Sequence, residues 1–231
     1  MTAEETHEKL KQIKQSFRLF MNGVTAQSMR EKGADYKINW GIDLVNLRKI
    51  ANEYGKDYDL AIALWKENSR ECKILATYIM PSDKMIPEIA DIWLEQMSTQ
   101  EIVELLSFNL LRYVDFAPSL AYQCLASNKS LYQVCGFQIL ACLFSDGKEP
   151  NERGTNEFLD QAEVALGGND LVVKQAAYRC VMRFCDLGEE YEMIAKKALM
   201  KFWILPSRTA STSVSSYLVR VSLTSLYGCI T

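Results

Sequence analysis

The sequence is poor in the residues that many catalytic and metal sites need. It contains one histidine, His7, so a Ser–His–Asp set in the body of the chain is excluded. Its seven cysteines are scattered and form no Cys-x-x-Cys pair, which argues against a zinc site. The two glycines of ALGGND (165–170) lack the GxGxxG spacing of a nucleotide-binding loop. We therefore expect neither a metal nor a cofactor.

Long apolar runs, prolines and glycines are also scarce. No run reaches the roughly 18 apolar residues of a membrane helix, so we expect no membrane partner. The start, MTAEETHEKLKQIKQ, is acidic and polar, unlike a signal peptide. An odd number of cysteines without a disulfide framework suits a reducing cytoplasm. With only five prolines and eleven glycines in 231 residues, most of the chain should be ordered.

An excess of positive charge is missing as well. The chain has 26 basic and 29 acidic residues, a net charge of −3. Nonspecific DNA binding relies on a basic face, so the total charge does not favour it. A local basic patch is still compatible with this total, because net charge is a global sum.

Helical periodicity, in contrast, extends over residues 4–204. Apolar residues recur at helical spacing, and no alternating β-branched stretch interrupts them, so we predict an all-α body. Gly55 should end one helix, and Asp43 should cap its start. The expected helical segments are 4–32 (one or two helices), 44–55, 58–67, 69–80, 83–97, 98–114, 119–127, 130–144, 156–168, 169–186 and 188–204.

These segments form repeated pairs. Four second helices are expected to begin after polar caps at Asn68, Ser98, Asn128 and Asn169, and Ser98-x-x-Glu101 resembles a capping box. Helix pairs that recur about every 30 to 45 residues indicate a HEAT/armadillo-like superhelix, in which neighbouring pairs bury each other's apolar faces. We assign residues 1–204 to this repeat domain and 205–231 to a Ser/Thr-rich C-terminal tail of unassigned structure.

Two stretches resemble a known family. LWKENSRECKILATYIM (64–80) and LVVKQAAYRCVMRF (171–184) are similar to helices of the DNA alkylation repair family, HEAT-repeat DNA glycosylases, over roughly residues 10–200. The resemblance implies a concave, positively charged surface that grips double-stranded DNA. It also implies excision of alkylated purines, in which a carboxylate stabilises the developing positive sugar and aromatic rings contact the lesion.

The resemblance also implies site residues. The family's catalytic Asp falls on Glu104, its preceding aromatic residue on Gln100, its phosphate-binding Arg on Gln133 and its second Trp on Arg179, with Tyr178 adjacent. Only the carboxylate role is retained, one methylene longer. We therefore predict a degraded glycosylase site, with Glu104 as the candidate catalytic residue.

Each of these residues also has a purely structural interpretation. Glu104 and Glu101 are compatible with first-turn acids that a helix dipole favours. Arg179 and Arg183, with Lys174 nearby, are candidate phosphate contacts or a solvated helix face. The same choice applies to Arg70, a groove cation or half of an ion pair between repeats with Glu71.

The tryptophans allow both base stacking and core packing, and apolar neighbours favour the core. They are Trp40, Trp65, Trp93 and Trp203.

Two functions follow from these observations. The first is a DNA-alkylation-repair-like protein that binds DNA through a concave groove and has diverged catalytic positions. The alternative is a noncatalytic helical-repeat scaffold that binds a protein partner. A basic groove would favour the first function, and a neutral or acidic groove the second.

Overall fold

The computed structural model describes residues 2–202, and there the chain is built from helices. Within that part, the only β-type pairing is one isolated bridge between Ile38 and Ser69, so the all-α prediction is confirmed for it. None of its helices combines the length and apolar character needed to cross a bilayer. The predictions for the segment 205–231, Trp203 and Cys229 lie outside the described residues.

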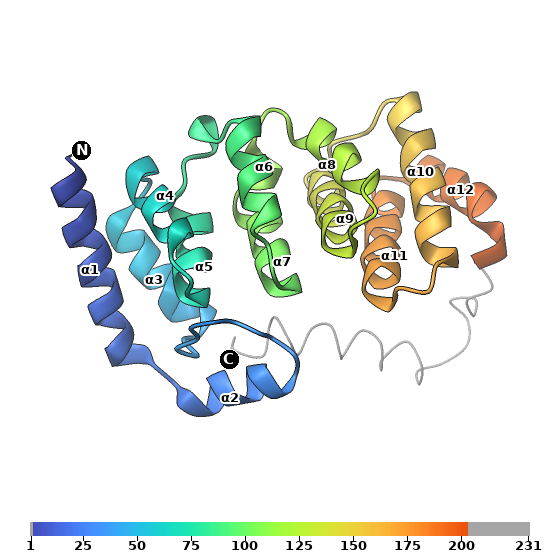
Figure 1. The fold of residues 1–231 in the computed structure, drawn as a ribbon. Coiled ribbons are helices and arrows are strands. Elements are labelled where there is room, and N and C mark those ends of the chain that lie inside the picture. Colours follow the sequence, from blue (N-terminus) through green and yellow to red (C-terminus); the bar gives the residue numbers. More distant parts are fainter. Residues whose placement is uncertain (1, 203–231) are drawn as a thin grey trace.

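Figure 1 shows the helices following one another along an arc that begins with α1 and ends with α12. Their bounds are α1 (Ala3–Phe20), α2 (Gly23–Glu31), α3 (Leu44–Tyr54), α4 (Tyr58–Lys66), α5 (Arg70–Ile79), α6 (Pro87–Glu95), α7 (Gln100–Asn109), α8 (Ala117–Leu125), α9 (Ser130–Ser145), α10 (Glu152–Gly167), α11 (Leu171–Cys185) and α12 (Glu189–Ala198). Short 3-10 turns lie at Ser82–Lys84, Leu111–Tyr113 and Met200–Phe202.

The helices are arranged as stacked pairs. α4 packs on α5, α8 on α9 and α10 on α11, while α5, α7, α9 and α11 pack one against the next. We call these last four helices the second-helix row. α9 is apolar on almost every side because α7, α8 and α11 surround it. The result is one continuous hydrophobic core along the array, as a HEAT-like repeat requires.

Two tryptophans join neighbouring pairs. Trp65 of α4 stacks on Trp93 of α6, with ring centroids 4.0 Å apart and planes 2° from parallel. Both side chains are buried, which confirms that they belong to the core. Leu64, beside Trp65, is also fully buried, so the Leu–Trp pair that ends α4 is a core contact between repeats.

Several predicted helix starts are confirmed, and others are wrong by one residue. Asp43 accepts a hydrogen bond from the Asn46 amide, and Gly55 ends α3 with φ +65°. The cap of α7, however, is Thr99 and not Ser98. Likewise, Asp170 caps α11 in place of Asn169. In both corrections the next residue along also has a side-chain oxygen, and the backbone places that oxygen over the first-turn amides.

The two remaining predicted second-helix caps are also displaced by one residue. Ser69 precedes α5 and Lys129 precedes α9, in place of Asn68 and Asn128, and neither side chain caps the helix. At the start of α5 the Arg70 amide donates instead to the carbonyl oxygen of Ile38.

Two expected segment boundaries are wrong by a full turn. α10 begins at Glu152, inside the expected loop 145–155, because the Asn151 side chain accepts from the Gly154 amide and starts the helix early. α6 begins at Pro87 and not near Asp83, which lies in a separate 3-10 turn. Proline is favoured in the first turn of a helix because its missing N–H has no intrahelical partner there.

A buried ion cluster fastens the loop 32–43 to the second-helix row. The Arg70 guanidinium is 1% exposed and lies 2.6 Å from Glu101 Oε1 and 3.2 Å from Glu71 Oε1. It also donates to the carbonyl oxygen of Ile42 at 2.9 Å. The structural interpretation of Arg70 is therefore confirmed: it joins α5 to α7 and to the preceding loop.

Candidate nucleic-acid interface

Glu104 and Arg179 form the central contact of the candidate site. Glu104 lies in the second turn of α7, so it is not the first-turn acid that we also considered. Arg179 lies in the middle of α11, and its Nη2 is 3.1 Å from Glu104 Oε1. Because α9 packs against both helices, this ion pair connects second helices that are two repeats apart.

Gln100 completes the same cluster from the preceding turn of α7. Its Nε2 donates to Glu104 Oε1 at 2.9 Å, the geometry of residues four apart on one helix. One carboxylate oxygen thus accepts from both an amide and a guanidinium. The Glu104 side chain is 11% exposed and Arg179 34% exposed, so the cluster lies at the edge of the core with one side open.

Arg179 is only partly satisfied by this contact. Its Nε is buried, and no acceptor for it lies among residues 2–202. The guanidinium is therefore held through one hydrogen bond to Glu104 and not by the two-pronged contact that arginine commonly makes with a carboxylate. The other terminal nitrogen of Arg179, Nη1, therefore does not bond to Glu104.

Gln133 is held apart from this cluster by its own contact. It lies in the first turn of α9, and its Nε2 donates to the carbonyl oxygen of Ser127 at 2.9 Å. That bond fastens the side chain to the turn between α8 and α9. The structure thus brings together Gln100, Glu104 and Arg179, and gives Gln133 a separate local partner.

The other three predicted contacts lie along α11. Tyr178 and Arg183 are exposed, and Lys174 is partly buried. Arg183 Nη1 lies 3.2 Å from Asp186 Oδ2 in a solvent-exposed pair, which is only weakly held. Lys174 forms no ion pair with any residue that the structure describes. The helix therefore presents one unpaired cation, one weakly paired cation and a phenol.

A second polar contact, near the start of α7, was not predicted from the sequence. Tyr36, in the loop 32–43, donates to Glu101 Oε2 at 2.6 Å, and its hydroxyl lies 2.7 Å from Thr99 Oγ1. Burial raises the pKa of Tyr36 above its ordinary value, and the Glu101 charge adds to that effect. Burial also raises the pKa of Glu101, but the Arg70 and Tyr36 hydrogen bonds outweigh it and hold that pKa below its ordinary value.

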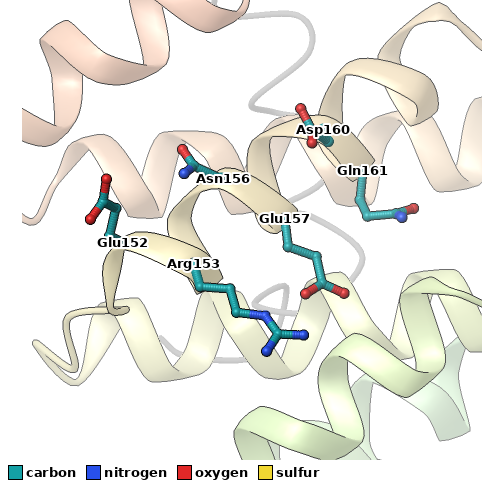
Figure 2. Close-up of a pocket in the computed structure, with 6 residues that line it drawn as sticks. All are labelled: Glu152, Arg153, Asn156, Glu157, Asp160 and Gln161. Carbon is teal, nitrogen blue, oxygen red and sulfur yellow. The ribbon is translucent and has the colours of Figure 1, made fainter.

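The arrangement of α10 offers a contrasting surface. Figure 2 shows a depression on this one helix, lined by Glu152, Arg153, Asn156, Glu157, Asp160 and Gln161. Its three carboxylates outnumber its one guanidinium, so it does not suit a phosphate backbone. Among residues 2–202, no group of three metal-ligating side chains comes together.

The stacked helix pairs define an all-α, HEAT-like repeat protein over the described residues. Residues 13–166, more than half of the chain, match the family described as "DNA alkylation repair enzyme". The chain belongs to this family. No curated protein matches the sequence.

A solved structure has the same fold. It is described as "A new family of proteins related to the HEAT-like repeat DNA glycosylases with affinity for branched DNA structures". The TM-score is 0.77 and the identity 15%, and the match covers 94% of this chain and 95% of that one. At this identity the likeness shows the fold alone. Because both chains are covered almost fully, it extends over nearly the whole length of each.

Proposed function

We propose that the protein binds DNA through its second-helix row, prefers branched over linear DNA, and does not excise alkylated purines. The observation that carries this proposal is the shared oxygen of Glu104, which accepts from Gln100 at 2.9 Å and from Arg179 at 3.1 Å. Family membership supports DNA as the ligand, and the contacts of Glu104 argue against the family's chemistry.

The argument against excision is electrostatic. An N-alkylated purine is cationic, and its departure leaves a positively charged sugar that a free carboxylate would stabilise. In this protein the Arg179 guanidinium neutralises the Glu104 carboxylate and places a positive charge beside it. With its charge cancelled in this way, the carboxylate attracts a cationic base less and stabilises less of the charge that develops when the bond breaks. Gln100 offers an amide where stacking would need an aromatic ring.

The argument for binding rests on α11 and its neighbours. We expect Lys174 and Arg183 of α11 to contact phosphates and Tyr178, which is exposed, to offer a hydroxyl or stacking contact. We expect Gln100 on α7 and Gln133 on α9 to add contacts through the amide hydrogen that each does not donate to Glu104 or Ser127. Such contacts to the sugar-phosphate backbone position a protein on DNA without reading its sequence.

We infer the preference for branched DNA by extending the similarity in fold to a similarity in ligand. The structural relative is described as having affinity for branched DNA. A protein that recognises the shape of a junction needs no pocket for a damaged base. This is consistent with a site whose carboxylate is occupied by its own arginine.

Fluorescence anisotropy with a four-way junction and with a linear duplex, each across a salt series, tests the binding. We expect salt-dependent binding of both and tighter binding of the junction. No salt-dependent signal at micromolar protein would reject DNA as the ligand and favour the protein-binding scaffold. Equal affinity for both DNAs would reject the branched preference alone.

A second assay tests the absence of excision. Methylated duplex DNA is incubated with the protein, and released 7-methylguanine is quantified beside a sample without protein. We expect release at the level of that blank. Release well above the blank that disappears in Glu104→Gln would show that the carboxylate is catalytic despite its ion pair.

A further inference from the structure

Four apolar side chains that are close together in the sequence are exposed where α1 gives way to α2. Leu19 and Val24 are 80% and 81% exposed, Met21 is 56% exposed and Phe20 is 37% exposed. We call Leu19, Phe20, Met21 and Val24 the α1–α2 corner. Single exposed apolar residues need no explanation, but several within six positions of the chain are a candidate binding surface.

Three exposed cations flank the α1–α2 corner in the sequence. Residues 9–32 contain six basic residues and one acidic residue, of which Lys9, Lys11 and Lys14 pair with Asp57, Glu8 and Glu67. Arg18, Arg30 and Lys32 are exposed and form no ion pair with any residue in the described part of the chain. The corner therefore combines an apolar tip with unpaired cations before and after it in the sequence. This combination is complementary to a polyanion whose apolar faces are accessible, such as a nucleic acid with exposed bases.

The corner is firmly held on its inner side. The Asn22 amide donates to the carbonyl oxygen of Trp40 at 2.8 Å, and Ala26 is buried against Gly41. The loop that carries Trp40 and Gly41 is in turn fastened to Glu101 at the start of α7. Through these contacts the corner is connected to the end of α7 that bears Gln100.

Figure 1 shows α2 set apart from the rows of helices, at the end of the array that carries α1. The corner is thus an attached projection on the molecule and not part of the stacked pairs.

We propose that the α1–α2 corner places its apolar side chains against unstacked bases at a DNA branch point, while Arg18, Arg30 and Lys32 contact the adjoining phosphates. The inference rests on the proposed function and names the element that distinguishes branched from linear DNA. A continuous duplex hides the faces of its bases, whereas a branch point exposes some of them. Apolar wedges and stacking platforms are recurrent means of binding exposed bases, and neighbouring cations bind the backbone.

A membrane surface would also attract apolar and basic residues, but the shape of α1 disfavours it. A helix that lies on a bilayer needs an apolar stripe along its length. The buried residues of α1, Ile13 and Phe17, face the core, and the exposed apolar residues are confined to its last turn and the start of α2. Such a short tip fits a gap between bases better than a flat bilayer.

The test uses the double variant Leu19→Ser/Val24→Ser in the full-length protein. A matched control is Val164→Ser, which removes a 73% exposed apolar side chain from α10. Anisotropy is measured with a four-way junction and with a linear duplex of the same arm sequence. We expect the double variant to lose about tenfold in the ratio of junction to duplex affinity, because the apolar wedge at the branch point is removed, with duplex affinity unchanged.

The control should behave as the wild type in both titrations. Circular dichroism and thermal melting check that the double variant is folded, as expected when only exposed side chains change.

Each outcome has a distinct meaning. If the wild type prefers the junction and the double variant keeps that preference, the corner is not the branch-point element, while the proposed function stands. If the wild type binds no DNA, both proposals are overturned. Sedimentation with phosphatidylserine-containing vesicles tests whether the corner binds a membrane surface instead. Binding to vesicles that the double variant loses, with junction preference intact, would assign the corner to a membrane.

Discussion

Arg179 on α11 binds Glu104 on α7 across the intervening α9, with Nη2 3.1 Å from Oε1. The contact holds two second helices of separate repeats at a fixed spacing. It also commits the one carboxylate at the expected catalytic position to an internal cation. In a DNA-binding protein such a pair has a further effect. Each charge partly cancels the electrostatic potential that the other would exert on DNA phosphates.

The first prediction concerns this pair. Glu104→Gln removes a negative charge from the proposed interface and releases Arg179 to contact phosphate. We expect duplex affinity to rise about threefold to tenfold, and the slope of log affinity against log salt to steepen by about one. Anisotropy across a salt series measures both.

Glu152→Gln on α10 is the control for charge alone, since Glu152 is exposed on the acidic depression away from the second-helix row. It should change affinity much less. Weaker DNA binding by Glu104→Gln than by the wild type would contradict the prediction and indicate that the carboxylate itself supports the ligand.

Local sequence signals account for most of the fold. The periodicity around Leu64 and Trp65, the cap at Asp43 and the glycine at position 55 each act within one or two turns of helix, so they can be recognised without tertiary information. Caps that are wrong by one residue, such as Ser98 for Thr99, arise because adjacent residues have similar capping oxygens.

The site was only partly predictable for the opposite reason. The hydrogen bond between Gln100 and Glu104 follows from a spacing of four residues on one helix. The contact of Arg179 with Glu104 joins residues 75 positions apart and depends on how three helices stack. The contact of Tyr36 with Glu101 depends on the path of a loop, for which the sequence carries no periodic signal.

The second prediction concerns the buried Arg70. Arg70→Ala leaves the carboxylates of Glu71 and Glu101 without their cation, and Glu71 is fully buried. Removing one partner of a buried ion pair costs about 3 to 5 kcal/mol in the free energy of unfolding. Urea unfolding followed by circular dichroism measures the change. Arg183→Ala, which breaks an exposed pair, should cost about 1 kcal/mol or less; similar costs for both would show that the cluster is not a stability determinant.

The third prediction follows from the lowered pKa of Glu101. Its folded-state pKa lies below the unfolded value, so its contribution to stability is complete above the ordinary carboxyl pKa of about 4.3 and is lost as pH falls toward the folded pKa. Glu101→Gln should therefore be less stable than the wild type at pH 7, and the difference should shrink below about pH 4.

Thermal melting between pH 7 and pH 3 measures this, with Glu88→Gln, an exposed acid on α6, as the control. A difference between Glu101→Gln and the wild type that stays constant across this range would contradict the assignment.

The fourth prediction concerns the attachment of α2. Gly41 has φ +68°, and a Cβ there would lie 2.1 Å from the carbonyl oxygen of Asn22, so Gly41→Ala should displace α2 from the loop beneath it. Gly33→Ala is a matched control, because Gly33 also has a positive φ, +87°, but a Cβ there would meet nothing within 4 Å. Both variants carry the backbone strain of alanine in this region, about 1 to 2 kcal/mol, and only Gly41→Ala adds the collision.

We expect brief trypsin digestion to cut Gly41→Ala faster at Arg30 and Lys32 than it cuts Gly33→Ala, with mass spectrometry identifying the fragments. The same variant should lose preference for the four-way junction, since the α1–α2 corner would no longer be held beside the start of α7. Equal digestion of the two variants would mean that α2 tolerates the added methyl group, and that close contact with Gly41 does not fix its position.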